Sequence, residues 1–204
     1  MLRRRRLLTA FGAVLSSTIL LSGCGGPGSG TVAEGSTETG EPVSGGTLRV
    51  IQTGEPRSLD PASLMNTWSH QPVLGNALYG TLMVNDIDTF DIEYTMAEDF
   101  STVDGGATFI LTLQPGLTFT DGTPLDAATV KFNWDRLRDP TLGSLSTRWA
   151  SAIAETEVVD PTTLKVVMTT PNPHFAQAIV SGGLNWIASP EALQKVPPRS
   201  TRTQ

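Results

Sequence analysis

Carboxylates and histidines are the first candidates for chemistry in this sequence, because these side chains bind metal ions and move protons. Asp86, Asp88 and Asp91 lie as close together as calcium-loop ligands do, but the glycine and the distal glutamate of such a loop are absent. Neither His70 nor His174 has a second ligand at metal-site spacing. We therefore predict a solvated turn at the three aspartates, with no metal site and no cofactor.

Asp121-Gly122-Thr123 is the one tripeptide that suggests hydrolysis, since aspartic proteases use an aspartate in such a loop. Here Phe119 and Pro124 flank it as they would a turn, and no second catalytic loop is available to share a proton. The sequence also contains no G-x-S-x-G elbow, P-loop or dinucleotide fingerprint. We predict that the protein is not an enzyme and has no catalytic residue.

Cys24 is the only thiol, and it follows a charged start and an uncharged apolar stretch from Leu7 to Ser22. That order is typical of a secretory signal peptide, and the stretch is shorter than the ~20 residues that span a bilayer. The junction Leu21-Ser22-Gly23-Cys24 resembles the bacterial lipobox. The resemblance implies that residues 1–23 are removed and that Cys24 carries a lipid, which anchors the protein outside the cell membrane. The choice between general and twin-arginine export stays open.

Residues 24–44 are dominated by Gly, Ser, Thr, Glu and Pro, which predicts a flexible linker. Loss of the signal peptide removes four arginines and no acid, so the net charge changes from −6 to −10. A surface of that charge repels nucleic acid, and we predict no such partner. A single cysteine cannot form an internal disulfide.

Hydrophobic periodicity predicts strands separated by a few helices. We expect a first strand at Thr47–Thr53, a helix within Met65–Thr81, a strand at Thr108–Leu113 and a short strand at Leu117–Thr120 that Asp121-Gly122 closes. Pro115-Gly116 fits the centre of a type II turn.

The second half of the sequence predicts a capped helix, a hairpin and one more helix. Asp126 is the expected N-cap of a helix that runs to about Arg138 and ends at Asp139-Pro140. Its apolar stripe is formed by Ala127, Val130, Trp134 and Leu137. The hairpin turns at Asp160-Pro161, between Val158-Val159 and Leu164–Met168, and the last helix lies near Phe175–Val180. The predicted fold class is mixed α/β.

Four blocks of the sequence read "GGTLRVIQTGEPRSLDPA", "ALYGTLMVND", "GGATFILTLQPGLTFTDGTPLDAATVKFNWDRLRDP" and "VVDPTTLKVVMTTPNPHF". In this order they resemble the N-terminal part of the solute-binding proteins of family 5, the extracytoplasmic receptors of peptide and nickel ABC importers. The resemblance covers residues 45–193 and implies a type II periplasmic-binding-protein-like fold, with its first lobe and a small extra domain. It also implies two partners, a peptide or other small solute and the permease subunits of the importer.

Members of that family are more than twice as long, and the closing residues "VPPRSTRTQ" do not resemble their continuation. We therefore expect a truncated domain over residues 45–193, without the second lobe, followed by an atypical tail at 194–204. Three alternatives stay open: a secreted lipoprotein that uses the partial fold as a non-transport interaction module, a non-functional fragment, and a lipoprotein hydrolase.

The resemblance also implies where a ligand would bind. In the oligopeptide members the chain after the Leu-Asp-Pro turn lines the cleft, which gives the candidates Met65, Asn66, Thr67 and Trp68. A core or rim position for Trp68 is an open alternative. The stretch after Asp139-Pro140 gives a second set, Ser144 and Ser146.

Overall fold

The computed structural model describes residues 44–56, 58–67 and 71–195. The chain divides into two units, Met1–Leu48 and Arg49–Gln204, and every helix and strand described below belongs to the second. Cys24, Trp68 and His70 lie outside the described residues, so the predictions for the signal peptide, the lipid and Trp68 do too. No helix within the described ranges is long and apolar enough to cross a membrane.

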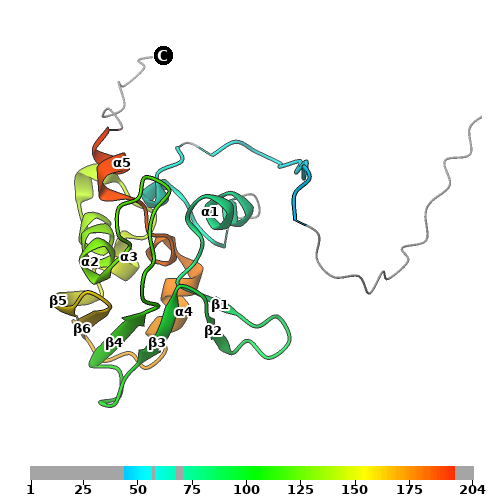
Figure 1. Cartoon of the computed structure of the whole chain (residues 1–204). Coiled ribbons are helices and arrows are strands. Elements are labelled where there is room, and N and C mark those ends of the chain that lie inside the picture. Colours follow the sequence, from blue (N-terminus) through cyan, green and yellow to red (C-terminus); the bar gives the residue numbers. More distant parts are fainter. Residues whose placement is uncertain (1–43, 57, 68–70, 196–204) are drawn as a thin grey trace, which may run out of the picture. The chain divides into compact units, whose positions relative to one another are not determined.

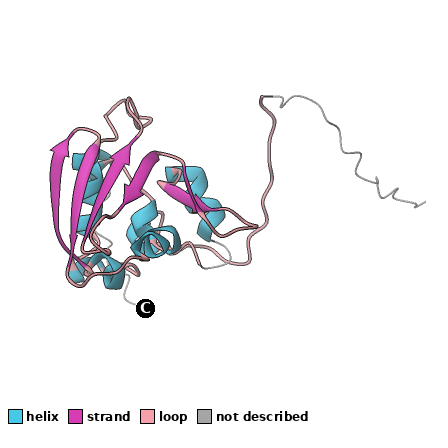
Figure 2. Ribbon diagram, turned by 90° about the horizontal axis from the view of Figure 1, so that it is seen from below, coloured by secondary structure: helices cyan, strands magenta, loops and turns pink. Residues whose placement is uncertain are grey.

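The largest element of the fold is an antiparallel sheet with the strand order β3-β4-β6-β5 (Figures 1 and 2). Its strands are β3 (Ala97–Ser101), β4 (Thr108–Leu113), β5 (Ile153–Asp160) and β6 (Thr163–Met168). β4 has the predicted bounds, and β5 and β6 form the predicted hairpin around Asp160-Pro161. Together with the helices, the sheet confirms the mixed α/β fold class.

Alternation along the strands places one face of this sheet in the core. On β4, Phe109, Leu111 and Leu113 are buried, whereas Ile110 between them is exposed. The ring of Phe109 stacks on Phe100 of β3 with 4.7 Å between ring centroids, and Phe175 packs against both rings at an angle. These ring contacts join strands β3 and β4 to the helix that begins at Phe175.

Helix α2 (Ala127–Arg136) packs against β5 and β6, as its sequence pattern leads one to expect (Figure 1). The Asp126 carboxylate accepts a hydrogen bond from the Thr129 N–H at 2.9 Å, which confirms the predicted N-cap. All four residues of the predicted stripe are buried: Ala127, Val130, Trp134 and Leu137. The helix ends two residues before the predicted Arg138, and a 3₁₀ turn, η2 (Pro140–Leu142), follows.

Shorter helices complete the unit. They are η1 (Pro61–Ser63), α1 (Gln71–Tyr79), α3 (Thr147–Ala150), α4 (Phe175–Ser181), η3 (Gly183–Asn185) and α5 (Pro190–Lys195). α1 and α4 confirm the helices predicted within Met65–Thr81 and near Phe175–Val180. On α1, however, the buried positions are Gln71 and Gly75, while Val73 and Leu78 are about half exposed.

Gly75 is buried because the ring of Trp186 packs directly against its Cα. A Cβ at this position would lie 2.8 Å from Cη2 of Trp186 and closer still to two other ring atoms. The indole N–H of Trp186 donates to the Asn76 Oδ1 at 2.9 Å. The ring is fully buried, so the missing side chain of Gly75 is what admits it.

Asn185 extends the ladder of a second, two-stranded ribbon of β1 (Met83–Asn85) and β2 (Ile92–Tyr94). Its side-chain Oδ1 accepts hydrogen bonds from the N–H groups of Leu82 and Met83, at 2.9 and 3.1 Å. Its Nδ2 donates to the Met83 carbonyl at 2.8 Å. Asn185 is fully buried and acts towards β1 as the peptide group of a neighbouring strand would.

Two of the predicted strands are wrong. Thr47–Thr53 forms no strand, and Leu48 and Ile51 are 87% and 98% exposed. A strand needs a neighbour for its N–H and C=O groups, and no described strand pairs with this segment. Leu117–Thr120 contributes only a single bridge, from Thr118 to Pro124, because the chain turns back at once.

The loop between β1 and β2 holds Phe90 in the left-handed region, at a φ of 62°. This conformation is an outlier for an aromatic residue, since Cβ crowds the following carbonyl. The loop of Asp86, Asp88 and Asp91 is otherwise an exposed turn, as predicted.

We expect Phe90→Gly to raise the free energy of unfolding by about 0.5–1 kcal/mol, because glycine adopts this φ without strain but loses more entropy on folding. Urea unfolding measures the change. Ile87→Gly is the matched control, since Ile87 does not have a positive φ, and it should lower stability. A loss of stability in Phe90→Gly would contradict the prediction.

Candidate functional site

The Leu-Asp-Pro turn is held in place by Asp60. Its Oδ1 accepts a hydrogen bond from the Ala62 N–H at 2.9 Å, so Asp60 is the N-cap of η1. Both carboxylate oxygens also accept from the guanidinium of Arg136, at the end of α2. This two-point ion pair is mostly buried, and it fixes the direction in which the chain leaves towards residue 67.

The structure brings the two predicted ligand-binding stretches together, although about 80 positions separate them in the sequence. The Leu145 N–H donates to the Ala62 carbonyl at 3.1 Å. The hydroxyl of Ser146 lies 3.7 Å from the sulfur of Met65. A ligand that touched one stretch would therefore be close to the other.

Within this pair of stretches, Met65 and Ser146 are interior residues. Met65 is 7% exposed and its N–H donates to Gln71 Oε1 at 2.6 Å. Ser146 is fully buried, and its hydroxyl accepts from the Gly183 N–H at 2.7 Å. In this structure both side chains pack segments together and do not face solvent.

The other candidates reach the surface. Asn66 is partly buried and its Nδ2 donates to the Val180 carbonyl at 2.6 Å. Thr67 is exposed, and Ser144 is partly exposed, with its hydroxyl accepting from the Ser146 N–H. Of the predicted ligand-binding residues that the structure describes, these three are the ones that a ligand could touch.

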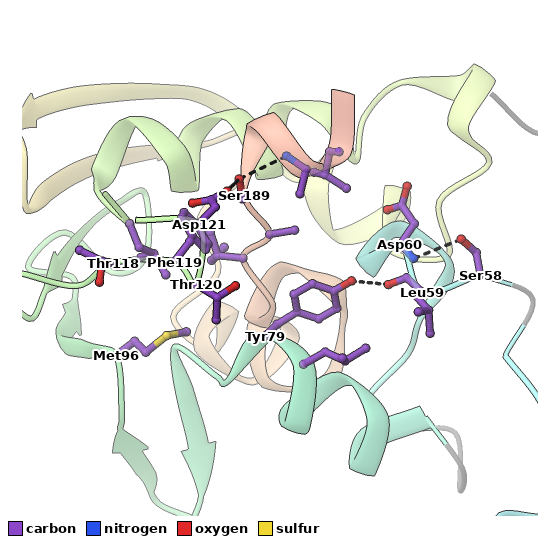
Figure 3. A pocket seen from close by; sticks show the side chains of 16 residues that line it. Ser58, Leu59, Asp60, Tyr79, Met96, Thr118, Phe119, Thr120, Asp121 and Ser189 are labelled. Atoms are coloured by element: carbon purple, nitrogen blue, oxygen red, sulfur yellow. Dashed lines mark hydrogen bonds between the residues drawn. The ribbon is translucent and has the colours of Figure 1, made fainter. Parts of the chain in front are cut away.

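A pocket of about 590 Å³ lies next to the same turn (Figure 3). Its walls come from residues 58–60, the end of α1, Met96, the loop 118–125 and the segment that leads into α5. Most of the lining is apolar, and its large side chains are Leu59, Leu78, Tyr79, Met96, Phe119, Leu125, Ile187 and Leu193. No residue predicted to bind a ligand lines this pocket.

Several polar groups of the pocket are hydrogen-bonded to the protein. The Tyr79 hydroxyl donates to the Leu59 carbonyl, and burial, together with the charge of Asp60, raises the pKa of Tyr79. The Ser189 hydroxyl donates to Asp121 at 2.6 Å (Figure 3). The N–H and the hydroxyl of Thr123 donate to the same carboxylate. These hydrogen bonds, that of Ser189 foremost, lower the pKa of Asp121 to about 2.

The Asp121 carboxylate accepts a hydrogen bond from the Ser189 hydroxyl, but its lowered pKa makes it a weak base for activating a nucleophile. The described ranges also contain no cluster of three His, Cys, Asp or Glu side chains that could hold a metal ion. Burial of apolar groups against the pocket walls is what this geometry supports.

Asp121 predicts a pH-dependent contribution to stability. Its pKa in the folded protein lies below the ordinary 3.8, so the stabilisation is present above pH 4 and is lost as the pH falls through about 2. Ser189→Ala removes the largest cause of this shift. We expect the difference in urea midpoint between wild type and Ser189→Ala to narrow as the pH falls from 5 to 2.

The control places Ser189→Ala in an Asp121→Asn background, where the side chain at position 121 does not titrate. In that background the change in urea midpoint caused by Ser189→Ala should be constant with pH. A difference that narrows equally in both backgrounds would show that Ser189 does not act through the Asp121 carboxylate.

Comparison with known proteins identifies relatives of this chain. Residues 91–198 match the family model described as "Bacterial extracellular solute-binding proteins, family 5 Middle". A protein named glutathione-binding protein GsiB, from Salmonella paratyphi A, is 34% identical over 138 residues, which are 68% of this chain and 26% of that protein. The chain therefore spans about a quarter of the length of such relatives.

Solved structures show the same fold. The murein tripeptide binding protein MppA of Escherichia coli superimposes with a TM-score of 0.58 at 23% identity, over 68% of this chain and 30% of that one. AgaA of A. tumefaciens R10, solved with agropinic acid, gives a TM-score of 0.61 at 25% identity, over 70% and 28%. The fold is thus that of part of a type II periplasmic binding protein, as the sequence blocks predicted.

Proposed function

The chain belongs to the bacterial extracellular solute-binding proteins of family 5, and on that premise we propose that it is part of the solute-binding component of an ABC-type importer. The observation that carries the proposal is the family match over residues 91–198, which includes the α2 helix and the β5–β6 hairpin. Such a component binds its solute outside the membrane and delivers it to the permease subunits. Binding, with no reaction, is its task.

We propose a small peptide as the solute. The 34% identical relative is named for glutathione, and a ligand of that kind presents amide and carboxylate groups. The hydroxyls of Thr67 and Ser144 and the amide of Asn66 can hydrogen-bond such groups. Met65 and Ser146 are buried next to these residues, and Trp68 follows them in the sequence as a further proposed contact.

We propose further that Cys24 is lipidated and becomes the first residue of the mature protein. The support is the Leu-Ser-Gly-Cys junction directly after the apolar run. We expect mass spectrometry of the membrane fraction to find a diacylated Cys24 and no residues 1–23, while Cys24→Ser should abolish the modification. An unmodified thiol on a chain that still starts at Met1 would contradict this proposal.

Solute uptake tests the function. Cells in which the gene for this protein is disrupted should take up labelled glutathione and tripeptides at background level, and the intact gene should restore uptake. Thr67→Arg places a bulky cation in the proposed contact and should prevent that restoration. Thr170→Arg is the matched control, because Thr170 is also exposed but lies after β6, outside the predicted stretches. Unchanged uptake without the chain would favour a non-transport interaction module.

A further inference from the structure

The loop between β1 and β2 presents two large apolar side chains to solvent. Ile87 is 85% exposed and Phe90 is 70% exposed. They lie three residues apart in the sequence, in a loop that projects outward from the ribbon (Figure 1). Contiguous exposed apolar groups mark interaction sites on soluble proteins, and aromatic residues dominate the binding energy of such sites.

The loop is also firmly built. The Asp86 carboxylate accepts from the N–H groups of Asp88 and Thr89, at 2.9 and 2.7 Å. The Phe90 N–H donates to the Asp86 carbonyl, and the Asp86 N–H donates to the Asp91 carbonyl. A loop with this many internal hydrogen bonds loses little freedom when a partner covers it, which favours binding.

The charges around the two apolar side chains restrict the partner. Asp86, Asp88 and Asp91 lie in or next to the loop, and the sequence from β1 to β2 contains no basic residue. Hydrogen bonds from the N–H groups of Thr89 and Asp88 to the Asp86 carboxylate lower the pKa of Asp86. An anionic lipid surface and a second copy of this acidic chain would both be repelled. A partner surface with an apolar recess edged by Lys or Arg would be attracted.

We propose that the tip formed by Ile87 and Phe90 docks onto the membrane subunits of the importer, in an apolar recess edged by basic side chains. This inference rests on the proposed function, which supplies the membrane subunits as partner. The apolar side chains contribute affinity by burial, and the aspartates contribute orientation and the rate of association.

Uptake separates this inference from the function on which it rests. Full chains carrying Ile87→Ser and Phe90→Gly together should restore uptake at least tenfold less well than wild type at limiting expression. Val103→Ser is the matched control, because Val103 is fully exposed in the loop between β3 and β4. Full restoration by the double variant would overturn the docking site alone. Uptake that does not need the chain at all would overturn the function and the docking site together.

Crosslinking identifies the partner directly. A photoreactive benzoylphenylalanine at position 90 of the full chain, in living cells, should form an adduct with a membrane subunit of an ABC importer. The same group at position 103 should form none. Adducts only with lipid, only with a second copy of the chain, or equally at both positions would overturn the proposal.

Discussion

Asn185→Leu should lower the free energy of unfolding by about 2–4 kcal/mol. The substitution removes the acceptor of the Leu82 and Met83 N–H groups and the donor to the Met83 carbonyl. Each buried backbone group that loses its hydrogen bond costs about 1–3 kcal/mol. The Leu82 N–H retains a second acceptor, the Asn185 carbonyl, and this limits the total. Urea unfolding measures the loss.

Asn172→Leu is the matched control, because Asn172 is exposed and its side chain accepts a single hydrogen bond, from the His174 N–H. It should cost less than about 1 kcal/mol. Hydrogen exchange should also distinguish the variants, with the Met83 amide losing protection in Asn185→Leu before the β4 amides do. Equal stability losses in the two variants would show that Asn185 does not complete the β1 ladder.

Gly75→Ala should lower the free energy of unfolding by about 2–3 kcal/mol, although alanine favours a helix over glycine by about 1 kcal/mol. The added methyl group would overlap the Trp186 ring, a buried and hydrogen-bonded side chain that cannot move aside. Overpacking of this kind in a dense core costs about 1–3 kcal/mol or more. Thermal unfolding followed by tryptophan fluorescence measures the effect.

A double-mutant cycle assigns the cause. Trp186→Leu alone opens a cavity and should destabilise the protein, but Gly75→Ala in that background should cost far less than in the wild type. Val73→Ala, at a half-exposed position of the same helix, should stay within about 0.5 kcal/mol of wild type. Additive effects at positions 75 and 186 would rule out the steric explanation.

Features that depend on neighbouring residues could be predicted from the sequence. The α2 helix follows from a local cap and a stripe at helical spacing, and the β5–β6 hairpin follows from an Asp-Pro turn between two apolar runs. Both are confirmed, because the signals that specify them lie within the elements themselves. The β4 alternation succeeded for the same reason.

Features that depend on distant residues could not be predicted. Thr47–Thr53 has the alternating pattern of a strand, but no described strand lies beside it. Gly75 weakens the helix pattern of α1, and only the contact with Trp186 explains why a glycine stands there. The burial of Ser146 could not be predicted either, because nothing near it in the sequence indicates that its hydroxyl accepts a hydrogen bond from the Gly183 N–H. The pocket beside Asp60 is lined by segments more than 130 positions apart, so no local pattern could show it.

The contact between α1 and Trp186 bears on how the protein is made. The hydrogen bond from the indole to Asn76 joins residues 110 positions apart. At about 5–20 residues per second, synthesis of the later residue follows that of the earlier by roughly 5–20 s. During that interval α1 has no ring to pack against, and a nine-residue helix alone is marginal in water. We therefore expect α1 to stay unstructured until Trp186 has been synthesised, a delay that would suit a chain exported as we propose.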